Sequence, residues 1–323
     1  MRGGFMKKVV NDLRLMIKAC DMYYNENLSQ QEIASKLNIS RPTLSRLLAS
    51  AKEQNLIKIQ VYDVDFVKYW KMSEELKKRY RLKDVVIADS GDSDQTTKSN
   101  IGRIAAAYLG HLIKDQDVVG ISMGSTLHQV VNEMKECEDK KITVIPLVGG
   151  VGQANLRIHA NSLAEQLAHL YHSEFHPIFA PARVFTQVVR NELMKDLTVS
   201  SMLEIASELN LAILGIGYPN EYSSIQTTGY FAENEMEMLI QKGVAGEINM
   251  QFYDLNGDTG PFKDNNYVIG VDVHKLRKIP VTVGIAGGVE KVRAIKGAIR
   301  GGYINTLITD YNCAVSLLED DQN

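Results

Sequence analysis

Residues 29–48 constrain this chain most, because they spell two short helices separated by a tight turn. Ser29 can accept a hydrogen bond from the first backbone N–H groups of a helix, and Glu32 stands three residues on, which is the pattern of a capping box. Ser40 can cap a second helix in the same way. Pro42 is tolerated in its first turn, where a backbone N–H has no intrahelical partner. The stretch therefore predicts a helix-turn-helix.

The second of these helices has two contrasting faces. Leu44, Leu47, Leu48 and Ala51 are spaced i, i+3, i+4 and i+7, so they form one apolar stripe that must be buried against the first helix. Short polar and basic side chains on the other face can reach base edges and phosphates in a DNA major groove. Two helices at this spacing are also a common packing unit. The residues that we expect to contact DNA are Arg41, Pro42, Thr43, Ser45 and Arg46.

The distribution of charge favours the DNA-binding interpretation. Residues 1–60 hold ten Lys or Arg and five Asp or Glu, a balance of +5, whereas the whole chain of 323 residues carries −3 and the remainder therefore carries −8. A basic segment on an otherwise acidic chain is typical of the part that meets nucleic acid. Double-stranded operator DNA is the partner that we expect at this end.

Length and composition favour an ordinary soluble protein with room for two folded units, since 45% of the residues are hydrophobic and 23% are charged. Cys20, Cys137 and Cys313 are scattered without CxxC spacing, which favours free thiols in a reducing compartment. The basic start lacks the apolar core of a signal peptide, and no run approaches the roughly 18 apolar residues of a membrane span. We expect a cytoplasmic protein that does not enter the membrane.

Three further segments belong to the first part of the chain. Residues 7–24 carry apolar side chains at helical spacing, which predicts a helix that braces the helix-turn-helix. Residues 56–61 alternate at period two, which predicts a short wing-like strand. Residues 66–80 predict a connecting helix whose aromatic face forms a dimer seam or packs onto the second domain. The expected domains are 1–62 for the helix-turn-helix, 63–82 for the linker helix and 83–323 for an effector and oligomerisation domain.

From Val85 onward, short apolar runs alternate with amphipathic segments. This rhythm predicts an α/β domain with a largely parallel sheet that helices cover. Ligands of such sheets bind beyond the C-terminal ends of the strands. The expected strands are 85–88, 117–122, 142–147, 212–217, 281–285 and 306–309, and the expected helices include 99–113, 160–172, 233–242 and 291–299.

The first candidate ligand loop closes the segment 117–126, which joins a strand to a helix expected at 127–135. Gly124 permits close approach to the backbone. Ser125, Thr126 and the free N–H groups of the helix start can hold a phosphate at the positive end of the helix dipole. An ordinary helix cap with a turn glycine fits the same residues equally well.

Other strand ends supply further polar groups. Gly215 and Gly217 close one strand, and Lys291 follows the glycine loop of another, where a lysine opposes the helix dipole unless an anion compensates it. Donors and acceptors suited to sugar hydroxyls follow the strand at 142–147, and two carboxylates stand near an expected bend. The expected effector-binding residues are Gly124, Ser125, Thr126, Gly149, Gly150, Arg157, His159, Asn161, Glu247, Asp254 and Lys291.

Signatures of metal and nucleotide chemistry are missing from the sequence. His169, His172 and His176 are spaced as metal ligands can be, but no Cys or carboxylate cluster completes a zinc site, and a solvated helix end explains them. Neither a Walker loop nor a full GxGxxG pattern occurs. We therefore expect no catalytic residue, no metal and no cofactor.

Five motifs, in this order, resemble those of the SorC family of bacterial sugar-responsive transcriptional regulators, which includes the deoxyribonucleoside regulator and the central glycolytic gene regulator. The resemblance covers residues 10–318. It implies an effector domain similar in fold to ribose-5-phosphate isomerase and glucosamine-6-phosphate deaminase. It also implies a homo-oligomer, typically a tetramer, whose operator binding is tuned by a phosphorylated sugar held at Gly124–Thr126 and Lys291. The motifs are 29–48, 120–126, 149–152 with 160–161, 246–254 and 286–291.

One position departs from the family pattern. Val148 stands directly before Gly149 and Gly150, where the deoxyribonucleoside branch has a lysine that forms a Schiff base and the glycolytic branch has a phosphate-binding arginine. The valine argues against a covalent effector and against the effectors of both branches. It makes Arg157 and His159 the candidates for the far end of the ligand.

Two functions from different classes remain open. The first is a transcriptional regulator, a repressor, in which a sugar phosphate changes the arrangement of paired helix-turn-helix modules. The alternative is a sugar-phosphate isomerase or deaminase with an appended DNA-binding domain, for which Glu247 or Asp254 would serve as the general base. Neither carboxylate lies in a motif tied to catalysis, so we expect a regulator and not an enzyme.

Overall fold

The computed structural model describes residues 12–54, 56–57, 69–150, 156–218 and 230–319. The chain divides into two compact units, residues 1–63 and 64–323, and each is described by itself. Within the described residues no helix is both long and apolar enough to cross a membrane.

The smaller unit consists of three helices: α2 (Leu13–Tyr24), α3 (Gln30–Lys36) and α4 (Arg41–Glu53). The predicted capping box is present at the start of α3, where the Ser29 hydroxyl accepts the Glu32 N–H and the Glu32 carboxylate accepts the Ser29 N–H at 2.8 Å. Asn38, with φ of 51°, makes the left-handed turn that precedes α4. Of the predicted strand 56–61, only residues 56 and 57 are described, and they lie in no strand.

The core of this unit confirms the predicted apolar stripe. Leu44, Leu47, Leu48 and Ala51 of α4 are all buried, and they share a cluster with Ile33 and Ala34 of α3 and with Met16 and Ala19 of α2. Each of these helices alone is too short to be stable. Close packing of the shared cluster therefore stabilises them and holds α3 and α4 at a fixed angle. The face of α4 opposite this core is therefore left to the solvent.

A seven-stranded sheet with the order β1-β9-β8-β5-β2-β3-β4 forms the centre of the larger unit, and every pair of neighbours in it is parallel. The predicted parallel α/β sheet is thus confirmed. All six predicted strands are present within a few residues of their expected ends. The strands are β1 (Asp84–Ala88), β2 (Val118–Ile121), β3 (Thr143–Pro146), β4 (Glu174–Phe175), β5 (Leu211–Gly215), β8 (Val281–Ile285) and β9 (Thr306–Asp310).

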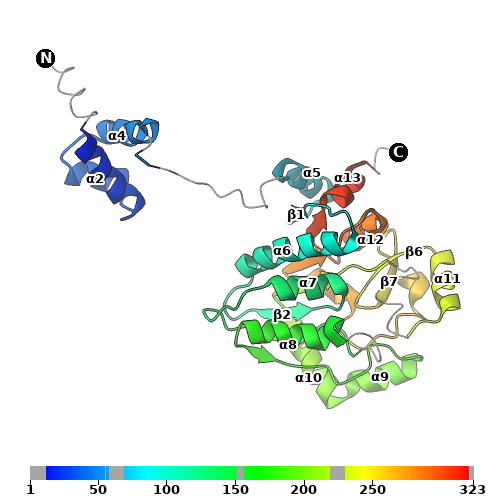
Figure 1. The fold of residues 1–323 in the computed structure, drawn as a ribbon. Coiled ribbons are helices and arrows are strands. Elements are labelled where there is room, and N and C mark those ends of the chain that lie inside the picture. Colours follow the sequence, from blue (N-terminus) through cyan, green and yellow to red (C-terminus); the bar gives the residue numbers. More distant parts are fainter. Residues whose placement is uncertain (1–11, 55, 58–68, 151–155, 219–229, 320–323) are drawn as a thin grey trace. The chain divides into compact units, whose positions relative to one another are not determined.

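Helices cover both faces of this sheet (Figure 1). One face packs against α6 (Asp94–Leu112), α7 (Ser125–Glu133) and α8 (Ala160–Leu170), and the other against α5 (Trp70–Tyr80), α10 (Leu197–Ile205), α12 (Val292–Arg300) and α13 (Tyr311–Glu319). Alternate residues of a strand serve the two faces: Val85 and Ile87 belong to one apolar cluster, Val86 and Ala88 to the other. Burial on both faces is why these strands read as continuous apolar runs in the sequence.

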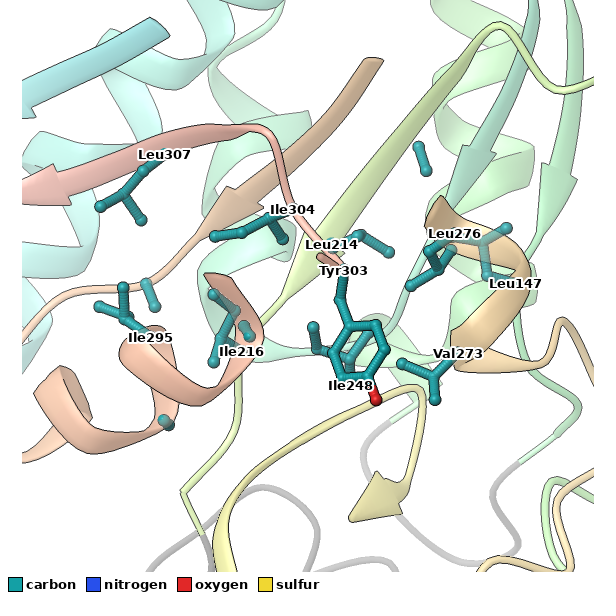
Figure 2. Packing of buried hydrophobic residues seen from close by; sticks show 14 of the residues in the cluster. Leu147, Leu214, Ile216, Ile248, Val273, Leu276, Ile295, Tyr303, Ile304 and Leu307 are labelled. Carbon is teal, nitrogen blue, oxygen red and sulfur yellow. The ribbon is translucent and has the colours of Figure 1, made fainter. Parts of the chain in front are cut away.

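The second face is packed around Tyr303. Its ring is fully buried and lies among Leu214, Ile216, Ile248 and Val273, which come from the end of β5, from residue 248 and from residue 273 (Figure 2). The Tyr303 hydroxyl donates to the carbonyl of Gly257, which satisfies the one polar atom of this side chain. This packing fixes the segment after β5, which contains Ile216, and the segment around Ile248 to the sheet.

An antiparallel hairpin, β6 (Val244–Ile248) and β7 (Gln251–Asp254), stands apart from the main sheet. Asn249 and Met250 in its turn both have positive φ, as a two-residue hairpin turn of the primed type requires. Together with α11 (Glu233–Gln241) the hairpin encloses a separate apolar cluster that contains Phe252 and Val148. The sequence predicts a bend here but not the hairpin.

Helix α5 lies within the predicted connecting helix 66–80, of which residues 66–68 are not described. It packs onto the larger unit: Leu76 is fully buried, and the Tyr80 hydroxyl donates to the carbonyl of Leu317 in α13 at 2.7 Å. Of the two interpretations of its aromatic face, these contacts favour packing onto the second domain. The sequence does not predict α13, α10 or α9 (Gln187–Lys195).

Candidate effector pocket and DNA-contact face

A pocket of about 340 Å³ opens at the C-terminal ends of β2, β5 and β8. From β2 the chain runs outward through β3 and β4, then returns to β5 and continues in the other direction. Such a reversal leaves a crevice between the loops of neighbouring strands, which is where open α/β sheets bind ligands. The pocket is lined by Asp94, Lys98, Met123, Gly124, Ser125, Thr126, Leu127, Gly215, Ile216, Gly217, Glu247, Met250, Ile285, Ala286, Gly287, Glu290 and Lys291.

Helix α7 begins at this pocket. Gly124 directly precedes the helix with φ of 138°, a conformation that side-chain-bearing residues rarely adopt, and its N–H donates to the carbonyl of Ile158 at 3.0 Å. Among the described residues, no side chain caps this helix start. The N–H groups of the first turn, together with the Ser125 and Thr126 hydroxyls, are consequently available to an anion.

Two lysines also line the pocket. Lys291 ends the short helix η6 (Val289–Lys291), and Lys98 comes from α6, where its ammonium group contacts the Asp94 carboxylate at 2.6 Å. Burial lowers the pKa of Lys291, and the carboxylates of Glu247 and Glu290 oppose that effect. The two lysines also repel one another. A bound anion between them and the α7 start would relieve this repulsion.

Glu247 lies deep in the pocket wall on β6. Burial raises its pKa to about 7, although a hydrogen bond from the Met250 N–H at 2.8 Å and the charge of Lys291 act in the other direction. Its carboxylate lies over Gly217, because a Cβ added there would stand 1.9 Å from Oε1, and the two backbones exchange N–H···O bonds of 2.9 Å. Only glycine at position 217 leaves room for this carboxylate, whose oxygens can accept hydrogen bonds from hydroxyl groups.

Five of the expected effector residues line this pocket: Gly124, Ser125, Thr126, Glu247 and Lys291. Lys98, Glu290 and Met250 also line the pocket, although the sequence did not predict them. Lys98 follows Asp94 by four residues, a helical spacing, but the expected helix 99–113 begins too late to include the pair. Met250 had no signal in the sequence, because its place depends on the hairpin turn.

The other expected effector residues do not line the pocket. Asn161 instead pairs with the backbone of Ile178, accepting its N–H at 3.1 Å and donating to its carbonyl at 3.0 Å. Asp254 caps a turn by accepting the N–H groups of Asn256 and Asp258, each at 2.8 Å. Short polar side chains readily make such local backbone bonds, and sequence spacing cannot separate them from ligand contacts.

The loop after β3 accounts for the remaining four. Gly149 and Gly150 bond through their N–H groups to the carbonyls of Ile269 and Ala180, and His159 is buried in front of α8. Arg157 is exposed in the short helix η1 (Leu156–Ile158), beside residues 151–155, which are not described. Val148 is fully buried in the hairpin cluster and likewise does not line the pocket.

The structure also explains a GxSxG spacing that was overlooked in the sequence. Residues 120–124 read Gly-Ile-Ser-Met-Gly, which matches the GxSxG pattern of a nucleophile elbow. Ser122 is only 1% exposed, and its N–H bonds to the carbonyl of Ile213 within the sheet. It does not line the pocket, so the glycines here serve the turn into α7 and not an exposed nucleophile.

On the smaller unit, the face of α4 turned away from the core carries Arg41, Pro42, Ser45 and Arg46, all exposed. Thr43, which we expected on this face, is 8% exposed and its hydroxyl is hydrogen-bonded to the Ser40 hydroxyl at 2.8 Å. It belongs to the helix cap, because position 43 is the third residue after Ser40 and so meets the capping side chain.

Comparison with known proteins agrees with the boundary between the two units at residues 63 and 64. Residues 64–319 match the model of a sugar-binding domain family. The deoxyribonucleoside regulator of Bacillus subtilis is 31% identical over 308 residues, covering 95% of this chain and 98% of that protein. The chain belongs to the SorC family of sugar-binding transcriptional regulators.

The chain is also similar to transcriptional regulators of known structure. The sorbitol operon regulator of Klebsiella pneumoniae is 30% identical, and its full-length crystal structure superposes with a TM-score of 0.72 over 96% of this chain and 100% of that one. A transcriptional regulator from Listeria monocytogenes, 26% identical, matches with a TM-score of 0.71 over 77% of this chain and 98% of that one. The relatives are transcriptional regulators, which favours regulation over enzymatic turnover.

Proposed function

We propose that this SorC-family chain is a cytoplasmic DNA-binding repressor whose operator affinity is controlled by a monophosphorylated sugar or polyol bound in the pocket. The observation that carries the proposal is the α7 start. Its first-turn N–H groups have no side-chain cap, and Ser125 and Thr126 line the same pocket as Lys98 and Lys291. Hydrogen-bond donors at a helix N-terminus together with cations are the features that bind phosphate.

The rest of the pocket suits the carbohydrate end of such a ligand. Glu247 supplies two acceptor oxygens close to Lys291, so hydroxyl groups can donate to it while the phosphate lies on the cations. Val148 is buried and does not line the pocket. As a valine it also lacks the basic side chain that other branches of the family have at this position. One phosphate, not two, and no covalent bond to position 148 are therefore proposed.

DNA binding is assigned to α4, with Arg41, Pro42, Ser45 and Arg46 facing the groove. Paired modules on a two-fold operator require a homo-oligomer, a dimer or a tetramer. The effector must bind the DNA-competent and DNA-incompetent states with different affinities, since equal affinity shifts nothing. A hundredfold difference corresponds to about 2.7 kcal/mol of coupling.

Thermal shift measurements with a panel of sugars and sugar phosphates test the effector class. Ribose 5-phosphate, glucosamine 6-phosphate and sorbitol 6-phosphate are compared with the unphosphorylated compounds. A ligand at 100 times its Kd stabilises the fold by about 2.7 kcal/mol. Lys291→Met should remove most of the shift, whereas Lys195→Met, which removes an equal charge from α9 outside the pocket, should leave it unchanged. Stabilisation by unphosphorylated compounds alone contradicts the phosphate assignment.

The same ligands distinguish a regulator from an isomerase or deaminase. Incubation with ribose 5-phosphate or glucosamine 6-phosphate should yield no product, and measurable turnover would overturn the assignment as a regulator.

Operator binding is tested by footprinting of Arg46→Ala. We expect a loss of about 1–3 kcal/mol if the guanidinium makes a bidentate base contact. An unchanged footprint would remove Arg46 from the reading face.

A further inference from the structure

Asp310 connects the pocket to a separate part of the larger unit. It ends β9, is 2% exposed, and its two oxygens accept hydrogen bonds from groups on different segments. Oδ1 accepts the Gly288 N–H at 2.7 Å. Oδ2 accepts the Ser90 hydroxyl at 2.5 Å and the N–H of Asn312 at 3.2 Å. A buried carboxyl group cannot give up such donors without leaving buried polar atoms unpaired, which is costly.

On one side of Asp310 stands the glycine loop of the pocket. Gly287 lines the pocket, and a Cβ added there would stand 2.8 Å from Asp310 Oδ1. Gly288 adopts φ of 97°, and the loop leads directly into Glu290 and Lys291. The Asp310 carboxyl therefore fixes the backbone that places Lys291 against a ligand. A ligand that draws on Lys291 must act on this backbone as well.

On the other side stands the start of α5. Ser90 follows Asp89, whose carboxylate accepts the Tyr69 hydroxyl at 2.5 Å. The Tyr69 ring packs on the ring of Tyr311, the residue after Asp310, with centroids 5.0 Å apart. Tyr69 occupies the N-cap position of α5 and follows residues 58–68, which lead from the smaller unit and are not described. None of Tyr69, Asp89 and Tyr311 is among the described residues that line the pocket.

We infer that Asp310 and Tyr69 are positioning residues that couple occupancy of the pocket to the start of α5, and so to the connection with the DNA-binding unit. The inference rests on the proposed function, since it assigns the regulation of that same pocket. A ligand that shifts the Gly287–Lys291 loop moves the donor to Asp310. The carboxyl, tied equally to Ser90, carries the change to the Asp89–Tyr69 contact. Coupling of this kind is established by measured energies and not by proximity.

The chain contains a single tryptophan, Trp70, directly after Tyr69. It is 54% exposed and does not line the ligand pocket, so its fluorescence reports on the start of α5 and not on the ligand itself. The full-length protein is titrated with ribose 5-phosphate and with inorganic phosphate while Trp70 emission and thermal stability are followed in parallel. We expect both readouts to saturate over the same range of ligand concentration.

Tyr69→Phe is the deciding variant, because it keeps the ring that packs on Tyr311 and removes the hydroxyl that donates to Asp89. We expect the ligand-dependent change in Trp70 emission to fall by at least about fivefold, the lower end of typical coupling. The half-saturating concentration in the thermal shift should stay within about twofold, since the pocket is untouched. Asp310→Asn should lose the fluorescence change too, but it also risks misfolding, so Tyr69→Phe carries the conclusion.

Tyr108→Phe is the matched control. The Tyr108 hydroxyl donates to Asp84 at 2.8 Å, an equivalent bond at the opposite end of β1, and Tyr108 lines the same surface groove as Trp70. This variant should keep the full fluorescence response. An undiminished response in Tyr69→Phe, or a thermal shift without any Trp70 change in the unmutated protein, overturns the coupling while the proposed function stands. If neither these two ligands nor the other sugar phosphates of the panel stabilise the protein or change Trp70 emission, the proposed function and the coupling are both contradicted.

Discussion

At the scale of single residues, Glu247 makes the stability of the fold depend on pH. Burial raises its pKa from near 4.5 to about 7, so the folded state binds this proton more tightly than the unfolded chain. The resulting contribution to stability is present below pH 4.5 and is lost as the pH rises towards 7. It amounts to on the order of 3 kcal/mol at 1.36 kcal/mol per pKa unit.

Glu247→Gln should abolish this loss, because the amide oxygen can still accept the Met250 N–H and carries no charge at any pH. Urea unfolding of both proteins at pH 5 and pH 8 measures the difference. Between pH 5 and pH 8, we expect the free energy of unfolding to fall less in the variant than in the unmutated protein. Parallel pH dependences would show that another group sets the pH response.

Asn161 tests the separation between structural and ligand-binding side chains. Asn161→Ala removes both bonds to the Ile178 backbone, which should lower the free energy of unfolding by about 1–3 kcal/mol. The affinity for the sugar phosphate should stay unchanged. Ser125→Ala should show the reverse pattern, weaker ligand binding with nearly unchanged stability. A large loss of affinity in Asn161→Ala would return this residue to the effector site.

At the scale of elements, the turn into α7 depends on backbone conformation more than on space. A Cβ at Gly124 or at Gly110 of α6 would meet no atom within 4 Å, but Gly124 has φ of 138° and Gly110 lies inside a regular helix. Gly124→Ala should therefore cost about 1–3 kcal/mol of strain and weaken phosphate binding by turning the first N–H groups of α7. Gly110→Ala should be neutral or stabilising by up to about 1 kcal/mol. Equal effects of the two substitutions on unfolding and ligand titration would disprove this account.

The sequence predicts elements that carry their own signal. The strands are continuous apolar runs, and α3 begins at a capping box, so both are recognisable locally. The hairpin β6–β7 is not, since its pairing partners are set by Phe252 and Met250 packing against α11 and Val148. Helix α9 is equally hidden, because none of its residues is fully buried and its contacts with the core, Leu193 and Met194, are only partly buried. Pocket residues at helix starts and glycine loops were predictable from the sequence. The position of Met250 was not, because it depends on the hairpin turn.

At the scale of the whole molecule, sensing and DNA contact are assigned to separate units. The apolar cluster of α2, α3 and α4 contains no residue of the larger unit, and every described residue of the pocket belongs to residues 64–323. The sugar-binding domain family model, which matches residues 64–319, covers the larger unit and none of the smaller. The acidic charge of the larger unit also makes it a poor partner for DNA by itself.

A chain that begins at Val64 should therefore still bind the ligand but no longer bind the operator specifically. We expect its Kd for the stabilising sugar phosphate to lie within about twofold of the full-length value, since no ligand contact is removed. Its affinity for operator DNA should fall to the non-specific level, which is typically about 10³-fold or more weaker than specific binding. Titration calorimetry and gel-shift assays on both proteins provide the comparison. Weakened ligand binding in the shorter chain would show that the smaller unit contributes to the pocket, and retained operator binding would remove α4 from its assigned role.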